Sequence, residues 1–278
     1  MSNFKKLKVM RKNRFLLVAM LFAALSLGFV SCDNKGNEPD DPQGEKTEQG
    51  GSSENNGGEE TPEPADPYNG HAYVDLGLPS GLKWATCNVG ATKPEEYGNY
   101  YAWGEVEPKE VYSWSTYKFM DSSVNDWNGV NKYTVADSQN EYADVVWYDN
   151  SGNFIGDNKT VLDKEDDAAT VNMGGEWRMP TAEEQQELID ECTWTWTTLN
   201  GINGCNVEGP NGNSIFLPAT GFRYESELNI AGSNGCYWSS SLDVSISFYA
   251  YGLGFQSDNL DSFSDARCYG APVRGVIE

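Results

Sequence analysis

Basic side chains are scarce in this sequence, and histidine is almost absent. Lysine and arginine together number 19 against 42 aspartates and glutamates, and His71 is the single histidine. A Ser-His-Asp triad would depend on that one residue, and a Cys/His zinc site is disfavoured because no CxxC spacing occurs. A glycosidase needs one defined pair of carboxylates, and nothing in the sequence selects such a pair. We therefore expect no catalytic residue and no metal site, and we predict that the chain is not an enzyme.

The shortage of positive charge also limits the partners. Residues 68–278 contain 11 basic residues against 31 acidic ones. Nucleic-acid phosphates are bound by lysine and arginine, and anionic lipid surfaces attract the same residues. We expect no nucleic-acid partner and no direct docking on anionic lipid, while calcium and neutral or cationic ligands stay open.

Long apolar runs are missing except at the start of the chain. Phe15–Val30 is apolar, follows a basic segment, and ends at Ser31-Cys32. A basic start, an apolar stretch of about 15 residues and a small residue before the cut are typical of a secretory signal peptide. The alternative is a stop-transfer helix, which needs about 20 apolar residues and usually a basic flank. The flank is Asp33-Asn34-Lys35-Gly36, so residues 1–32 are predicted to be a signal peptide.

The residues at the predicted cut resemble a bacterial lipobox. Phe29-Val30-Ser31-Cys32 fits that pattern, with Phe29 where the family usually has leucine. The resemblance implies that Cys32 is lipidated and becomes the new N-terminus. The chain is then a lipoprotein of the outer membrane or cell surface. Acyl chains such as palmitate, attached at Cys32, would anchor it in the membrane. Several acyl chains give stable anchoring where a single one is marginal.

Residues 33–67 lack aromatic and large aliphatic side chains. They contain 11 acids and two bases among glycine, serine, asparagine and proline. Such a segment buries too little apolar surface to offset its chain entropy, so we predict an acidic disordered tether. Its 35 residues would hold a domain about 30 Å from the membrane surface.

Residues 68–278 have a length that suits one domain with a sizeable core. Alternation over Tyr73–Ala85, interrupted by Pro79-Ser80-Gly81, predicts a strand, a turn and a strand. Residues 99–103 and 214–217 are further strand candidates. Long stretches rich in glycine, asparagine and serine lie between them. We predict an α+β domain with few helices and long structured loops.

One helix start is clear. Thr181 follows a proline and precedes Glu184 at the spacing of a capping box. The helix is expected to run to about Cys192, with Leu188 and Cys192 on one face.

Four segments resemble the Fibrobacter succinogenes major paralogous domain family. They are HAYVDLGLPSGLKWATCNVGATKPEEYGNYYAWGE (71–105), GGEWRMPTAEEQQELIDECTW (174–194), NSIFLPATGFRY (213–224) and GCYWSSS (235–241), followed by VRGV near the end. More distantly, WRMPTAEEQQEL is similar to the formylglycine-generating enzymes, although their cysteine-pair motif is not matched. The resemblance implies a C-type-lectin-like fold with adjacent termini, a small twisted sheet, one or two helices and a long loop region that carries the ligand face.

Cysteine number does not fix a disulfide pattern. Five cysteines follow Cys32, so at least one is free, and fifteen two-bridge pairings are open. Cys87 and Cys192 lie in segments that carry the family resemblance, and on that ground we expect a Cys87–Cys192 bridge.

Aromatic and arginine residues recur in these segments. We expect core packing for the tryptophans, although sugar stacking is the functional alternative, and ion pairs with acids for the arginines. The residues are Trp84, Trp103, Trp177, Trp238, Arg178 and Arg274.

An acidic cluster precedes the predicted helix. Its carboxylates offer oxygen ligands that suit calcium, but a solvated acidic loop is the favoured interpretation, and neither an EF-hand loop nor a Glu-Pro-Asn or Gln-Pro-Asp lectin signature is present. The cluster is Asp163, Glu165, Asp166 and Asp167.

The segment from Leu242 to Ala271 resembles the variable region of diversity-generating retroelement target proteins, which often use a C-type-lectin-like scaffold. Those systems randomise adenines in codons that end in a pyrimidine, so Lys, Glu, Gln, Met and Trp do not arise. These five types form about one fifth of the chain, so about six are expected in 30 residues, but only Gln256 occurs. The alternative is ordinary drift in a loop rich in glycine and serine.

Within that segment a regular skeleton alternates with irregular positions. Tyr251, Leu253 and Phe255 keep the period-two spacing of a strand face and are expected to be buried, as is Val273. The intervening residues are expected on one exposed ligand-binding surface: Phe248, Tyr249, Asp258, Asn259, Asp261, Phe263, Asp265 and Tyr269. The alternative is that Phe248 and Phe263 are core residues.

Two classes of function remain. The chain is either a surface lipoprotein that binds a glycan or protein through its variable C-terminal loops, or a structural cell-envelope lipoprotein with no soluble ligand.

Overall fold

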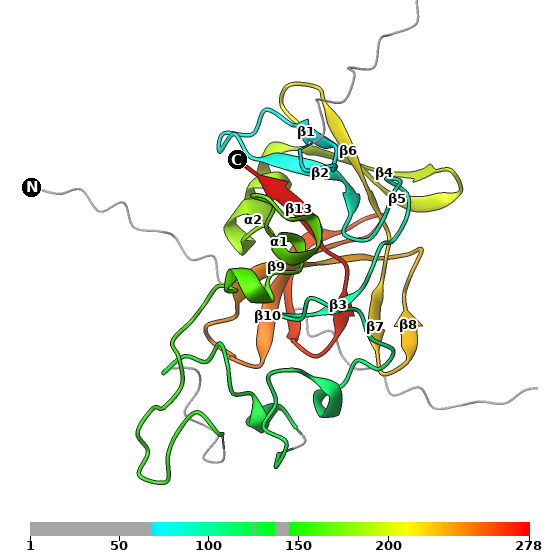
Figure 1. The fold of residues 1–278 in the computed structure, drawn as a ribbon. Helices are drawn as coiled ribbons and strands as arrows, with labels where there is room; N and C mark the ends of the chain where they lie inside the picture. Colours follow the sequence, from blue (N-terminus) through cyan, green and yellow to red (C-terminus); the bar gives the residue numbers. More distant parts are fainter. Residues whose placement is uncertain (1–67, 125, 137–144) are drawn as a thin grey trace, which may run out of the picture. The chain divides into compact units, whose positions relative to one another are not determined.

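The computed structural model describes residues 68–124, 126–136 and 145–278. In this part of the chain the fold is mixed α+β, with four small antiparallel sheets and two α-helices (Figure 1). The predicted signal peptide, Cys32 and the tether over residues 33–67 lie outside the described residues.

The first sheet joins the two ends of the domain. Strand β1 (Tyr73–Asp75) pairs with β2 (Lys83–Asn88), with Tyr73 opposite Ala85, which confirms the predicted strand, turn and strand. Strand β13 (Arg274–Ile277) pairs with the other edge of β2. The beginning and end of the described domain therefore share one sheet (Figure 1).

A second sheet has the order β4-β5-β6. Its strands are β4 (Thr193–Leu199), β5 (Ile202–Glu208) and β6 (Ser214–Pro218), and β6 covers the predicted 214–217 strand. Asn200 and Gly201 connect β4 to β5 with φ values of 49° and 85°. Positive φ at both positions is the geometry of a tight hairpin turn, which asparagine and glycine tolerate best.

The third sheet, β3-β12-β7-β8, gathers short strands from distant parts of the sequence. It consists of β3 (Tyr101–Ala102), β12 (Gly270–Ala271), β7 (Phe222–Tyr224) and β8 (Glu227–Asn229). The predicted strand at 99–103 is confirmed over its centre.

The fourth sheet contains the C-terminal hairpin. Strand β10 (Tyr249–Phe255) is central and pairs antiparallel with β9 (Gly235–Leu242) and β11 (Leu260–Ala266). The pairing with β9 shifts register between Ala250 and Gly252, whereas the pairing with β11 is regular.

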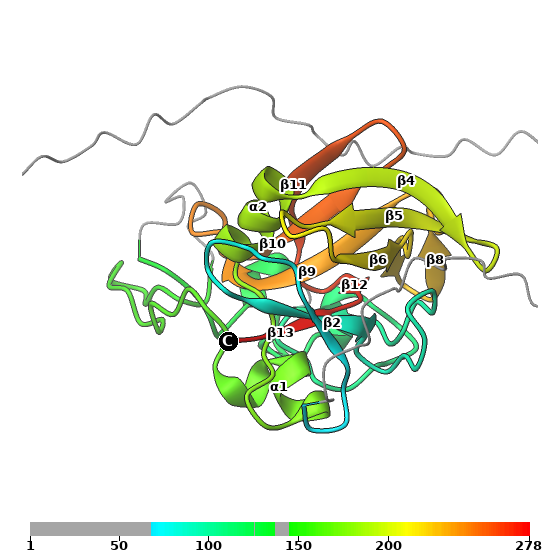
Figure 2. The same cartoon turned by 90° about the horizontal axis from the view of Figure 1, so that it is seen from above.

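The two α-helices follow one another closely. Helix α1 (Ala168–Met173) begins at Asp167, whose carboxylate accepts a hydrogen bond from the Thr170 N–H. Helix α2 (Ala182–Glu191) begins with the predicted capping box, in which Thr181 and Glu184 satisfy each other's backbone N–H. Helix α2 packs against β9, β10 and β11 (Figure 2).

Between β3 and α1 the described chain has no strand longer than a single bridge. It contains three 3-10 helices: η1 (Trp114–Thr116), η2 (Trp127–Gly129) and η3 (Lys164–Asp166). The expectation of long structured loops is confirmed for this stretch.

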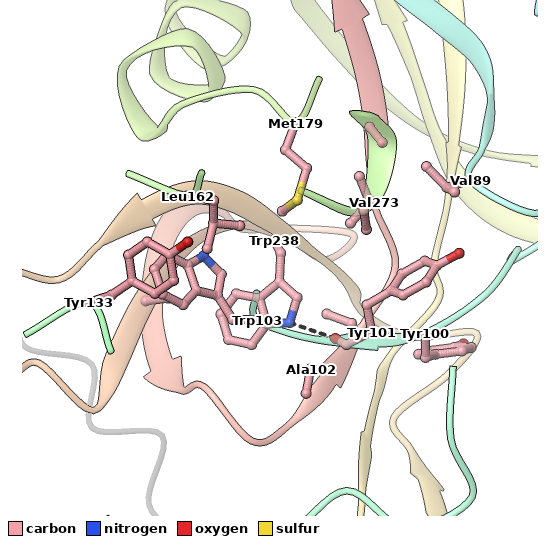
Figure 3. Packing of buried hydrophobic residues seen from close by; sticks show 14 of the residues in the cluster. Val89, Tyr100, Tyr101, Ala102, Trp103, Tyr133, Leu162, Met179, Trp238 and Val273 are labelled. Carbon is pink, nitrogen blue, oxygen red and sulfur yellow. Dashed lines mark hydrogen bonds between the residues drawn. The ribbon is translucent and has the colours of Figure 1, made fainter. Parts of the chain in front are cut away.

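All four motif tryptophans are core residues, as predicted. Trp103, Trp177 and Trp238 share one buried cluster, whereas Trp84 belongs to a second cluster with Leu188. We call these the Trp103 cluster and the Trp84 cluster. The Trp238 indole N–H donates to the Tyr101 carbonyl at 3.0 Å (Figure 3), so burial of this ring leaves no orphaned donor.

The motif arginines differ from one another. Arg178 forms the expected ion pair, with two 2.7 Å bonds to Glu184. The same expectation is wrong for Arg274, which is fully buried and bonds Asn88 and the carbonyls of Ala85, Thr86 and Phe216. Burial lowers the pKa of its guanidinium. Carbonyl acceptors replace a carboxylate here because the chain surrounds the side chain on every donor edge.

Candidate functional site: the β10–β11 hairpin

The candidate site is built on the two faces and the turn of the β10–β11 hairpin. Cross-strand partners share a face, and the register sets Gly252 opposite Phe263 and Gly254 opposite Asp261. Alternation therefore puts Asp261, Phe263 and Asp265 on one face, which we call the glycine face. Leu253 and Phe255 lie on the other face, inside the Trp84 cluster.

Phe263 lies across the two glycines. A Cβ added at Gly252 would come within 2.5 Å of the Phe263 ring, and one added at Gly254 within 3.3 Å. The Phe263 ring also packs on buried Trp238, with centroids 5.6 Å apart. Phe263 is half-buried, so one side of the ring contacts the core and the remainder is accessible.

The base of the hairpin carries three more of the predicted site residues. Phe248 packs on Trp127 and on Tyr249, with ring centroids 4.6 and 5.0 Å apart. Tyr269 stacks on Phe222 of β7 at 5.5 Å. Phe248, Tyr249 and Tyr269 are all half-buried. Each therefore has an accessible part of its ring while it packs on a neighbouring aromatic side chain.

The turn of the hairpin carries the polar members of the set. Asp258 and Asn259 are exposed in the loop between β10 and β11. They form part of the lining of a small pocket, of about 250 Å³, whose other wall includes Trp194 and Trp196 of β4. The two hairpins that form the pocket run beside each other (Figure 2).

The eight predicted residues thus divide into three groups. Asp261, Phe263 and Asp265 share the glycine face, Asp258 and Asn259 occupy the turn, and Phe248, Tyr249 and Tyr269 lie at the base. None of the eight is buried: three are exposed and five are half-buried. The strand register assigns Tyr249 to the face opposite Phe263, so the eight residues are distributed over both faces, the turn and the base of the hairpin.

The expected buried positions behave as predicted with one correction. Leu253, Phe255 and Val273 are at most 2% exposed. Tyr251 was expected to be buried but is half-buried. Its hydroxyl donates to the Asp243 carboxylate at 3.3 Å, which draws the end of the side chain out of the apolar core.

Asp265 is the electrostatically unusual member of the set. Within the described residues its carboxylate accepts one hydrogen bond, from the Ala266 N–H. Burial raises its pKa to about 6, despite that bond. The charged form has little compensation here because no lysine or arginine pairs with it in the described chain.

The acidic cluster is an ion-pair network. Asp166 is buried and accepts bonds from Lys118, Lys132 and the Tyr133 hydroxyl at 2.5–2.6 Å. Burial opposes its ionisation, but these bonds lower the pKa of Asp166. Although the side-chain oxygens of Asp163, Glu165 and Asp166 lie within 4.8 Å of one another, lysines already neutralise two of them. The expectation of a solvated acidic loop is therefore wrong for Asp166 and Asp167, which are 2% and 5% exposed. Lysines neutralise Asp166, and the Asp167 carboxylate accepts hydrogen bonds from the Thr170 and Met179 N–H groups.

The expected Cys87–Cys192 bridge is absent, and all five cysteines of the described chain are free. Cys192 packs against the Trp84 cluster. Cys87 shares a strand face with Ala85, which belongs to the Trp103 cluster. The two thiols therefore belong to different layers of the domain.

Two tryptophans that bear on the site were missed in the sequence. Trp194 and Trp196 are half-buried and alternate with exposed threonines along β4. The signal was available, because Thr193–Thr197 alternates threonine with tryptophan and the strand is followed by Asn200-Gly201, the strongest short hairpin signature.

Comparison with known proteins gives no further identification: no protein-family profile, curated protein or solved structure matches this chain. Among the described residues, no helix has the length and apolarity required to span a membrane.

Proposed function

We propose that this protein is a surface-displayed lipoprotein that binds a ligand, a glycan or a protein, through variable residues around its C-terminal hairpin. The proposal includes a lipid anchor at Cys32, an acidic tether and a C-type-lectin-like domain of the Fibrobacter succinogenes major paralogous type. It also treats residues 242–271 as a segment diversified by a retroelement.

One observation carries the proposal. None of the eight residues expected on the ligand face is buried, whereas the regular positions Leu253, Phe255, Arg267 and Val273 are buried. A binding face that tolerates many side chains requires this division, because a change at a buried position costs packing energy and a change at the surface usually costs little.

Arg267 explains how such a segment keeps its shape. Its guanidinium is fully buried and bonds the Tyr117 hydroxyl and the carbonyls of Lys132, Tyr133 and Ser247 at 2.8–3.2 Å. The hairpin is thereby attached to a loop more than 130 positions earlier in the chain. Backbone acceptors do not depend on the identity of neighbouring side chains, so the attachment is compatible with variation around it.

The composition of the accessible set supports binding over a purely structural role. Rigid aromatic rings give contact area at low entropy cost, and accessible aromatic clusters mark interaction sites. Phe248, Tyr249, Phe263 and Tyr269 supply such rings, and three aspartates and one asparagine lie among them.

The proposal is tested by measuring ligand capture by the full-length chain. Cells that display the wild-type protein are compared with cells that display a Phe263→Ala, Tyr269→Ala double variant, using arrays of glycans and surface proteins. We expect a captured ligand that the double variant loses by at least tenfold. Val171→Ala changes an exposed residue of α1 and is the matched control. Equal capture by the hairpin variant and wild type, at equal surface level, would favour the structural lipoprotein instead.

A further inference from the structure

The pocket at the tip of the β10–β11 hairpin is lined by two tryptophans of strand β4. Strand β4 is an edge strand of its sheet, and its sequence alternates Thr193, Trp194, Thr195 and Trp196. The threonines are exposed and the tryptophans are half-buried, turned toward the hairpin. Two indole rings therefore line a hollow of about 250 Å³.

The floor of the pocket is fixed. Phe255 is buried, and its ring lies 5.6 Å from that of Trp194 and 6.4 Å from that of Trp196. The Trp194 indole N–H donates to the Leu188 carbonyl at 3.1 Å, which holds that ring in place. No corresponding bond is formed by the Trp196 indole N–H within the described residues, so this donor is available to a ligand.

The rim of the pocket is polar and carries no cation. Gln256, Asp258 and Asn259 line it, and no lysine, arginine or histidine of the described part of the chain does so. Carboxylate and carboxamide groups accept and donate hydrogen bonds in the pattern that hydroxyl groups require. An anionic ligand would meet Asp258 without any compensating positive charge.

We infer that this pocket binds one ring of a neutral carbohydrate. A pyranose has an apolar C–H face, which suits an indole surface, and an edge of hydroxyl groups, which suits the Asp258 and Asn259 side chains. The volume of about 250 Å³ lies just below the 300–1,000 Å³ of pockets for drug-sized ligands and suits one sugar ring. The inference rests on the proposed function because Asp258 and Asn259 belong to the proposed binding face.

The pocket is lined both by residues outside the proposed variable segment and by residues within it. Trp194, Trp196 and Cys205 lie outside residues 242–271, whereas the rim belongs to that segment. The stacking surface is then constant, and variation at the rim selects among sugars that share an apolar face.

The inference is tested with the full-length protein in detergent on an array of neutral, amino and acidic oligosaccharides, followed by tryptophan-fluorescence titration with the best soluble glycan. We expect binding to neutral glycans and none to sialylated, uronate-containing or sulfated ones. Trp196→Ala should weaken binding at least tenfold, and Trp196→Phe by a smaller factor. Thr195→Ala, on the opposite face of β4, should leave binding unchanged.

A second variant covers the case in which Trp196→Ala does not fold, as judged by its near-UV circular dichroism. Asp258→Ala combined with Asn259→Ala changes only exposed turn residues and should weaken binding at least fivefold. Binding of acidic glycans as strong as that of neutral ones overturns the inference, as does unchanged binding by both variants. Capture of a protein ligand that needs Phe263 but not Trp196 also overturns it, and that result leaves the proposed function standing.

Discussion

Phe263 occupies the space that a side chain at Gly252 would need. The two residues are opposite each other in the β10–β11 register, and a Cβ at Gly252 would lie 2.5 Å from the Phe263 ring and 2.6 Å from the Tyr237 carbonyl. The glycine thus allows an aromatic ring to lie over the neighbouring strand and against Trp238, with the two ring planes tilted by 48°. An accessible aromatic face depends here on a missing side chain in the neighbouring strand.

Gly252→Ala tests that relationship. Because the Cβ meets both a ring and a backbone carbonyl, we expect a loss of about 1–3 kcal/mol in the free energy of unfolding. Denaturant titration measures it. Gly254→Ala is the matched control, since its Cβ would meet Phe263 at 3.3 Å, and its cost should be clearly smaller. Equal stability of the two variants would show that Phe263 does not lie as described.

Arg267→Lys tests the buried attachment of the hairpin. Lysine cannot reach four acceptors at once, so some buried carbonyls lose their hydrogen bonds. Each buried acceptor left without a partner destabilises the folded state by about 1–3 kcal/mol. We expect a loss of about 3 kcal/mol or more, seen as a lower denaturation midpoint. Arg178→Lys, in the more accessible ion pair with Glu184, should cost about 1 kcal/mol or less. A cost for Arg267→Lys no greater than this control would contradict the attachment.

Asp265 gives a pH dependence with a defined sign. Its pKa is raised to about 6 in the folded protein, above the value near 3.9 of an unfolded chain. The folded state therefore holds the extra proton between about pH 4 and 6, and stability falls as the pH rises through that window. Asp265→Asn should remove this fall and should be the more stable protein at pH 7, by up to about 2 kcal/mol. Thermal unfolding at pH 4.5 and pH 7 measures the difference, with Asp261→Asn as the exposed control on the same face.

The anchor is tested at Cys32. Cys32→Ala should abolish incorporation of labelled fatty acid and release the protein from the membrane fraction, because the acyl chains have no other attachment site in the lipobox-like segment. Cys87→Ala, which changes a cysteine of the folded domain, should still be labelled. Continued labelling of the Cys32 variant would refute the lipoprotein prediction.

Local signals predicted the local parts of the fold. The hairpin of β1 and β2, the capping box at Thr181 and Glu184, and the burial of Trp84 and Trp238 each follow from a few neighbouring residues or from side-chain size. These features do not depend on which distant residues they contact in the fold, so they can be predicted from a single sequence.

Features that depend on distant contacts were not predictable in the same way. Arg274 is satisfied by carbonyls that lie 58 to 189 positions away, and an expected carboxylate partner was therefore wrong. The separation of Cys87 from Cys192 into different layers has the same origin. The β4–β5 hairpin is different, because the Asn200-Gly201 turn was visible in the sequence and was overlooked together with Trp194 and Trp196.

The central claim is that the accessible residues around the β10–β11 hairpin form a diversified binding face on a constant buried frame. Sequencing the 3′ end of this gene across many cells and strains, with the neighbouring DNA, tests it most directly. We predict substitutions concentrated at Phe248, Tyr249, Asp258, Asn259, Asp261, Phe263, Asp265 and Tyr269. Leu253, Phe255, Arg267 and Val273 should be unchanged, and a near-repeat of the segment should lie beside a reverse-transcriptase gene. Substitutions spread evenly over exposed and buried positions, with no such repeat, would contradict the account.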